Sequence, residues 1–241
     1  MRQNTVLFLG DFDSGSPVHT ATRAAVLDAG AAHGAVLNTR WMGPEHLALY
    51  PGMVAECHAV VLVPSAANAP KAPPEPILPA LTMVRERGLP FLGTGEAHGL
   101  VFIEAAREIL GIQDAGTALY DSSVAHPVVH RIPWPEEDEA TTHEIEIDLT
   151  TDSDGPNPYD AIERVVETTD VVSGLNPDYA QVIVEAGFRP AGRDRQGGRP
   201  YLHVLEQHPY HVTAAFLPQV RSTSEAPHPL FLGLVAACLA R

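Results

Sequence analysis

Short apolar runs alternate with helix-like segments along the first half of the chain, and this alternation constrains the fold more than any other feature. Four segments are short and apolar enough to be strands: Thr5–Leu9, Ala35–Arg40, Ala59–Val63 and Pro90–Leu92. Three segments carry helical periodicity: Thr20–Ala32, Leu78–Arg87 and Gly99–Leu110. This order predicts a parallel sheet with helices on both faces. Such sheets bind ligands beyond the carboxyl ends of their strands, so we expect the site in the loops after Leu9, Val63 and Leu92.

The second half of the chain follows a different pattern. Strands are predicted at residues 124–132, 143–149, 201–205 and 211–216, and a last helix at 230–240. The strict alternation over His143–Leu149 is typical of an antiparallel sheet. Five prolines between Pro70 and Pro79 predict a loop after the third strand. We therefore predict one α/β domain over residues 1–241, with a mainly parallel sheet and an antiparallel portion in the second half.

The charge balance limits the partners. Fifteen Lys and Arg against thirty Asp and Glu give a formal net charge of −15, which disfavours nucleic acid and anionic membranes as partners. Cations and small zwitterions are compatible with this charge as partners. The two cysteines, Cys57 and Cys238, are too few for a disulfide framework, and no apolar run is long enough for a secretion signal or a bilayer span. These features predict a cytoplasmic protein.

A strand, a sharp turn of small residues and a helix follow one another at residues 90–107, PFLGTGEAHGLVFIEAAR. This order is the architecture of a nucleophile elbow. On this segment the chain resembles the class I glutamine amidotransferases, in particular the glutaminase domain of CTP synthase. Further matches to that domain are Leu7–Gly10, Leu110–Gly111, Asn176–Tyr179, Glu185–Gly187, His208–Gln219 and Pro227–Leu230. The resemblance covers nearly the whole chain.

The resemblance implies the amidotransferase-like, flavodoxin-like three-layer fold. In that family a Cys-His-Glu triad hydrolyses glutamine, and the Cys lies on the elbow. The resemblance puts the three positions at Gly95, Leu217 and Gln219, and it puts Ser65–Asn68 where the family has a Gly-Gly oxyanion loop. An acyl-enzyme needs a nucleophile and a base, and neither Gly95 nor Leu217 supplies one. We therefore expect no glutamine hydrolysis.

Glu96 and His98 are the candidate catalytic residues, because they follow the elbow position and are expected to point into the old substrate pocket as base and acid. The candidate substrate-binding residues are Asp11, Ser65, Asn68, Gly93 and Gly95. Two other interpretations stay open. Glu96 could be an ordinary acidic residue of a first helical turn, and a glycine at 95 would relieve backbone strain in an elbow that had lost its use.

A histidine-rich hairpin invites a metal interpretation. It contains His203, Glu206, His208 and His211, and His-x-x-His can chelate zinc on a suitable turn. His208, however, matches the His-Pro of the family's hairpin, where it is structural. The sequence also contains no Walker-type phosphate loop. We therefore predict neither a metal nor a cofactor.

Two functions of different classes remain. The first is an enzyme that acts on a small, polar, amino-acid-like molecule by acid/base chemistry through Glu96 and His98. The second is a non-catalytic ligand-binding or regulatory subunit. Both functions are compatible with a homodimer or with a partner enzyme acting in trans.

Overall fold

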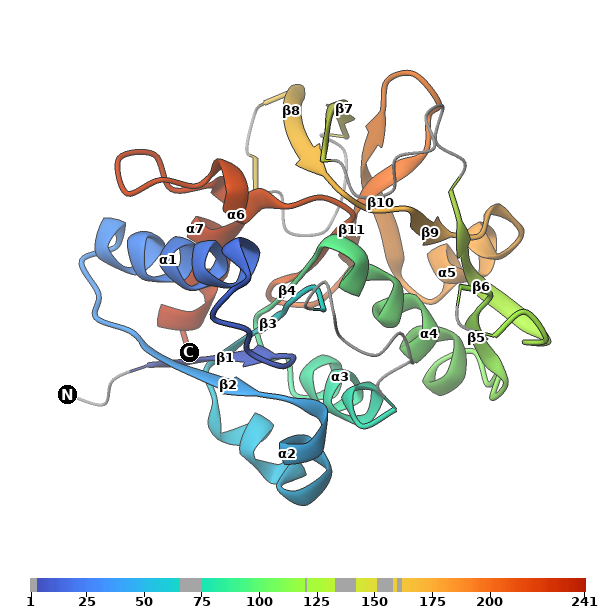
Figure 1. The fold of residues 1–241 in the computed structure, drawn as a ribbon, viewed down its shortest axis with the longest axis horizontal. Coiled ribbons are helices and arrows are strands. Elements are labelled where there is room, and N and C mark those ends of the chain that lie inside the picture. Colours follow the sequence, from blue (N-terminus) through green and yellow to red (C-terminus); the bar gives the residue numbers. More distant parts are fainter. Residues whose placement is uncertain (1–3, 66–74, 120, 133–141, 151–157, 160–161) are drawn as a thin grey trace.

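A nine-stranded mixed sheet forms the centre of the molecule in a computed structural model that describes residues 4–65, 75–119, 121–132, 142–150, 158–159 and 162–241. The strand order is β2-β1-β3-β4-β12-β11-β10-β7-β8 (Figure 1). A smaller sheet of order β5-β6-β9 lies beside it. Helices cover both faces of the large sheet, so the predicted α/β architecture is confirmed.

The first five strands of the large sheet are parallel. They are β2 (Asn38–Met42), β1 (Thr5–Leu9), β3 (Ala59–Leu62), β4 (Phe91–Thr94) and β12 (His211–Ala214). In β1 the side chains of Val6, Leu7, Phe8 and Leu9 are all buried. This continuous apolar run is what a strand covered on both faces requires.

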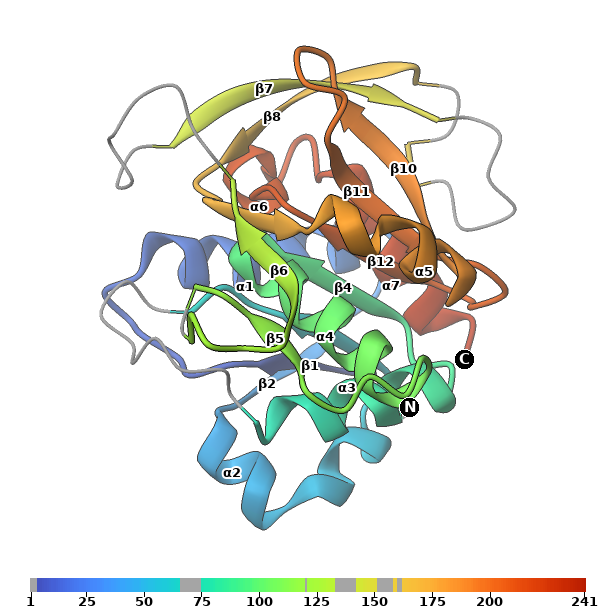
Figure 2. The same ribbon diagram turned by 90° about the vertical axis from the view of Figure 1, so that its right-hand side faces the viewer.

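The other half of the large sheet is antiparallel. Its strands are β11 (Pro200–Leu205), β10 (Phe188–Asp194), β7 (His143–Leu149) and β8 (Arg164–Thr169). The small sheet consists of β5 (Ala115–Thr117), β6 (His126–Arg131) and β9 (Ser173–Leu175). Figure 2 shows β7 and β8 lying across the top of the molecule, beyond the parallel strands.

Two hydrophobic clusters hold the three layers together. On one face α1 (Pro17–Ala32) and α7 (Pro229–Leu239) pack over Val6 and Phe8. On the other face α3 (Ile77–Glu86) and α4 (His98–Glu108) pack over Leu7 and Leu9. The shorter helices are α2 (Pro44–Leu49), α5 (Ala180–Glu185) and α6 (Pro218–Arg221). Alternate residues of one strand thus serve different cores, as the period of two dictates.

Several boundaries differ from those expected. α1 begins three residues early, at Pro17, because the Ser16 hydroxyl accepts from the His19 N–H and Pro is favoured at the first helical position. The second strand lies at 38–42 instead of 35–40. Pro79, expected in a loop, lies in the first turn of α3, where a missing N–H costs no hydrogen bond.

The sequence patterns also did not predict β5, β8, β9, β10, α2, α5 or α6. It expected only antiparallel pairing in the second half, whereas β12 pairs with β4 in parallel. Asn68, one of the candidate substrate-binding residues, lies outside the described residues. Within the described part of the chain, no helix has the length and apolarity needed to cross a bilayer.

Candidate functional site

The sharp turn after β4 is built on a glycine. Gly95 has φ of +60°, a conformation that residues with a side chain rarely adopt. It begins a single 3₁₀ turn over Gly95–Ala97, after which α4 starts. Its N–H donates to the carbonyl oxygen of Phe216 at 2.9 Å, which ties the turn to the segment after β12. The chain thus has the strand-turn-helix geometry of a nucleophile elbow with no side chain at the apex.

Two apolar side chains close over this apex. A Cβ atom at Gly95 would lie 2.7 Å from Cγ of Pro64 and 3.0 Å from Cδ2 of Leu217. Carbon atoms pack at about 3.5–4.0 Å. A side chain at position 95 would therefore have to displace Pro64 or Leu217.

Glu96 lies at the surface beyond the carboxyl end of β4. Its side chain is exposed, and Oε1 accepts a hydrogen bond of 3.3 Å from the backbone N–H of Ser65. Ser65 follows β3, so the contact joins the loops of two neighbouring parallel strands. This is the edge of the sheet where the sequence predicts ligand binding.

His98 points the other way. Its ring is only 2% exposed, contacts the edge of Phe102 with centroids 5.8 Å apart, and has Nδ1 2.8 Å from the carbonyl oxygen of Gly95. Burial lowers the pKa of His98 to about 4, so the ring is neutral at pH 7. The expectation that Glu96 and His98 both point into one pocket is therefore wrong in its geometry.

The two residues belong to different local structures. Glu96 lies in the 3₁₀ turn before α4, where its carboxylate accepts from the Ser65 N–H. His98 is the first residue of α4, and its ring packs beside Phe102 in the core. The spacing of two residues in the sequence therefore did not predict where each side chain lies.

Of the other candidate residues, Asp11 and Ser65 lie along the same edge. Asp11 is exposed after β1 and lies against Gly43, where a Cβ atom would come 1.8 Å from its Oδ1. Ser65 is exposed, and Asn68 is outside the described residues. Gly93 lies inside β4, with a virtual Cβ 2.9 Å from Oγ1 of Thr213. Close packing between strands accounts for this glycine.

Leu217 and Gln219 follow β12. The Leu217 side chain is buried, and its backbone N–H donates to the carbonyl oxygen of Thr168 at 2.7 Å. Gln219 is the second residue of the short helix α6, after Pro218, and is 2% exposed. Neither polar atom of its side chain has a hydrogen-bond partner among the described residues.

Neither thiol is near the elbow or activated. Cys57 is buried before β3, and Cys238 is buried in α7 among the residues of the core. Burial raises the pKa of both thiols. Both are therefore protonated at neutral pH and poor nucleophiles.

The histidines of the hairpin are buried in the sheet. His203 lies on β11 and His211 on β12, and the rings of His208 and His211 lie 5.2 Å apart. Across the residues with defined positions, no three His, Cys, Asp or Glu side chains gather as a metal site requires. Burial lowers the pKa of all three rings.

A buried polar cluster near α7 was not anticipated. The Glu167 carboxylate accepts from the Tyr159 hydroxyl at 2.8 Å and lies 2.9 Å from Nε2 of His228. Nδ1 of His228 accepts a hydrogen bond from the Leu230 N–H at the start of α7. Nε2 therefore carries the hydrogen of the neutral ring and donates a hydrogen bond to Glu167. The cluster joins β8 to the cap of α7. No sequence signal linked these three residues, because their contacts are long-range.

Comparison with known proteins agrees with this geometry. The chain is 30% identical to the CTP synthase of Methanopyrus kandleri over 229 residues, which are 91% of this chain and 42% of that enzyme. It is 25% identical to the CTP synthase of Acaryochloris marina over 241 residues, 98% of this chain and 43% of that enzyme. The glutaminase domain of Trypanosoma brucei CTPS, solved with bound acivicin, superposes with a TM-score of 0.86 at 17% identity, covering 99% of this chain and 95% of that one.

The chain is a class I glutamine amidotransferase-like domain, distantly related to the CTP synthase glutaminase domain. This confirms the resemblance seen in the sequence. A glutamine amidotransferase of Thermotoga maritima shares the fold at a TM-score of 0.59 and 9% identity, covering 100% of this chain and 98% of that one. The amidotransferase-like domain spans 30–44% of the length of the CTP synthases that it matches. No family model matches it.

Proposed function

We propose that this domain is an amidotransferase-like protein without glutaminase activity, which binds a small polar ligand and does not cleave it. The observation that carries the proposal is the elbow. Gly95 has no side chain, and Pro64 and Leu217 fill the space that a nucleophile would need. The resemblance puts the family's Cys and His at these same two positions, Gly95 and Leu217.

The electrostatics of the elbow support the same proposal. Acyl transfer requires backbone donors aimed at a developing oxyanion. The resemblance puts the family's oxyanion loop after β3, where the Ser65 N–H donates to the Glu96 carboxylate. A fixed negative charge at this donor would repel an oxyanion. Gln219 stands at the position of the family's Glu, and its side chain carries no charge.

We expect the purified domain to release no ammonia from glutamine above the buffer background, with or without the variant Gly95→Cys. The new thiol would lack a base, since position 217 is Leu. The pKa of the thiol would therefore stay at about 8.5. The variant should also lose stability, by about 1–2 kcal/mol for the left-handed conformation alone. A coupled ammonia assay measures glutamine hydrolysis, and mass spectrometry detects a glutamyl thioester on the new cysteine. A thioester on Gly95→Cys would contradict the proposal.

Acid/base catalysis by Glu96 is the second candidate function. Its support is the position of the carboxylate, which is exposed at the ligand-binding edge of the sheet. The sequence suggested His98 as the acid that works with Glu96, but the His98 ring is buried and neutral.

Glu96→Gln separates the two functions. Ligands are first found by a thermal-shift screen of amino acids and their amides, in which a ligand at 100 times its Kd stabilises the fold by about 2.7 kcal/mol. Each hit is then incubated with wild type and with Glu96→Gln, and products are measured by mass spectrometry. We expect binding to both proteins and product from neither. Product from wild type that Glu96→Gln abolishes would establish the enzyme instead.

A further inference from the structure

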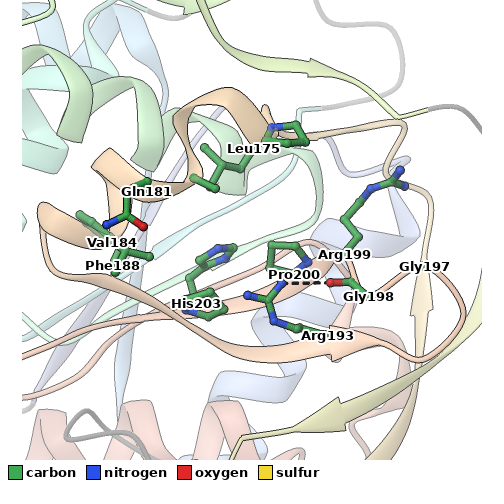
Figure 3. Close-up of a pocket in the computed structure, with 13 residues that line it drawn as sticks. Leu175, Gln181, Val184, Phe188, Arg193, Gly197, Gly198, Arg199, Pro200 and His203 are labelled. Carbon is green, nitrogen blue, oxygen red and sulfur yellow. Dashed lines mark hydrogen bonds between the residues drawn. The ribbon is translucent and has the colours of Figure 1, made fainter.

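A pocket of about 440 Å³ lies away from the elbow, between α5 and the β10–β11 hairpin (Figure 3). Leu175 of β9, Val184 of α5 and Phe188 of β10 form its apolar wall. Ligand pockets typically measure about 300–1,000 Å³ and are mostly apolar with a few polar groups. None of the elbow residues lines it, so it is a separate site.

The charged side chains that line the pocket are all cationic. Arg193 of β10 and Arg199 of the hairpin contribute guanidinium groups, and no acidic residue belongs to the described lining. The charge of the pocket lining is thus opposite to that of the whole chain, which has twice as many acidic as basic residues. The nearby Asp194 is engaged in the hairpin turn, where it accepts from the N–H groups of Gly197 and Arg199.

The two arginines are held in different ways. Nη1 of Arg193 donates to the Gly198 carbonyl oxygen at 3.0 Å, the contact drawn as a dashed line in Figure 3. This bond uses one of the five guanidinium donors and holds the side chain beside Pro200 in the pocket lining. Arg199 lies at the hairpin end, near Tyr201 and His130.

His203 supplies a polar group deep in the pocket. In Figure 3 its ring points from β11 toward Leu175, with Phe188 on one side and Arg193 on the other. The residue is 2% exposed, and neither ring nitrogen has a hydrogen-bond partner among the described residues. Burial, with Arg193 and His98 nearby, lowers the pKa of this ring to about 3, so it is neutral. A neutral imidazole offers one donor and one acceptor.

A purely structural role does not explain His203. A buried polar group without a partner destabilises the fold relative to an apolar group of the same size. The neighbouring ring of Phe102, at a centroid distance of 4.8 Å, provides packing but no hydrogen bond. An apolar residue would fill this position better, unless a ligand completes the hydrogen bonds.

We propose that this pocket binds a small organic anion, with its acidic group at Arg193, its apolar or aromatic body against Leu175, Val184 and Phe188, and a polar atom at His203. Guanidinium groups bind carboxylates and sulfonates through paired charge-assisted hydrogen bonds. The apolar wall favours an anion with a hydrocarbon body over inorganic phosphate. The proposal does not rest on the function proposed for the elbow, since no elbow residue lines this pocket.

A fluorescent anion and its neutral analogue test this assignment. The full chain is titrated with 8-anilinonaphthalene-1-sulfonate and, separately, with N-phenyl-1-naphthylamine, which lacks the sulfonate. We expect saturable binding of one sulfonate per chain. Arg193→Gln should weaken it by about tenfold or more, the factor for one charge-assisted hydrogen bond, and should leave the neutral analogue unaffected. Arg189→Gln is the matched control, because it removes the same charge from β10 at a residue that pairs with Glu206 outside the pocket.

His203→Leu tests the deep end of the pocket. We expect this variant to melt at the wild-type temperature or higher, since two unpartnered nitrogens are removed, and to bind the sulfonate differently from wild type by at least about threefold. Inorganic phosphate at equal concentration should not displace the probe, whereas benzoate should. The assignment is overturned if Arg193→Gln and Arg189→Gln bind the sulfonate alike, if the neutral analogue binds as tightly as the anion, or if binding does not saturate.

Discussion

Lowering the pH from 7.5 to 5.5 should reduce the free energy of unfolding steeply. His98, His203 and His211 are fully buried, and burial lowers the pKa of each, to about 4 for His98 and about 3 for His203. Below about pH 6.5 the unfolded chain binds protons at these rings while the folded chain does not. Protonation therefore favours the unfolded chain. The stability is fully present above pH 6.5 and is lost as the pH falls toward 4.

The expected loss is large. One such histidine contributes a slope of about 1.4 kcal/mol per pH unit, so three give up to about 4 kcal/mol per pH unit. Total stabilities are about 5–15 kcal/mol. A competing effect is relief of the repulsion behind the net charge of −15, but it requires protonation of carboxylates, whose ordinary pKa in model peptides is about 4. Between pH 6.5 and 5.5 the histidines should dominate.

Urea unfolding at pH 7.5, 6.5 and 5.5 measures this slope. His203→Leu provides the internal control, because it removes one of the three rings and should reduce the total loss between pH 7.5 and 5.5 by about 1.4 kcal/mol. An unfolding free energy that is constant between pH 7.5 and 5.5 would mean that these rings are protonated in the folded protein or reach water through local opening.

Arg85→Leu should destabilise the fold by about 3–5 kcal/mol, because it leaves a buried carboxylate without its partner. Arg85 of α3 donates to Glu104 of α4 through Nη2 at 2.8 Å and Nε at 3.1 Å. The side chain of Glu104 is 2% exposed and that of Arg85 is 17% exposed. The pair joins the two helices that cover one face of the parallel sheet. Thermal and urea unfolding measure the loss.

Two further variants make this result specific. Arg164→Leu removes the partner of Asp148 in a pair of which both side chains are about half exposed, and exposed pairs contribute little. It should change stability far less than Arg85→Leu. The double variant Arg85→Leu/Glu104→Leu should recover most of the loss, since no unpaired charge remains. Equal effects of Arg85→Leu and Arg164→Leu would show that Glu104 reaches water.

The parallel half of the fold was predictable for a physical reason. Strands covered on both faces must be apolar throughout, so β1 and β3 stand out as short runs. β10 and β8 carry charged residues on an exposed face, such as Arg193 and Arg164, and lack that signature. Helix starts were less predictable, because caps such as Ser16 and Pro17 act locally and override periodicity.

The candidate site was predictable in place but not in detail. Edge topology put Asp11, Ser65 and Glu96 at the carboxyl ends of β1, β3 and β4. The burial of His98 was not predicted, and the contact between Glu96 and the Ser65 N–H depends on how two loops approach each other. That approach is a property of the folded chain.

The amino-acid pattern was sufficient to predict the order of strands and helices in the first half, the amidotransferase-like resemblance and the lack of a thiol at position 95. Which distant side chains meet became known only from the folded chain. Leu175, Arg193 and His203 line one pocket because β9, β10 and β11 converge on α5, and Tyr159, Glu167 and His228 share one buried cluster. The physical reason is that strand order and register are set by long-range packing, which local sequence patterns do not encode.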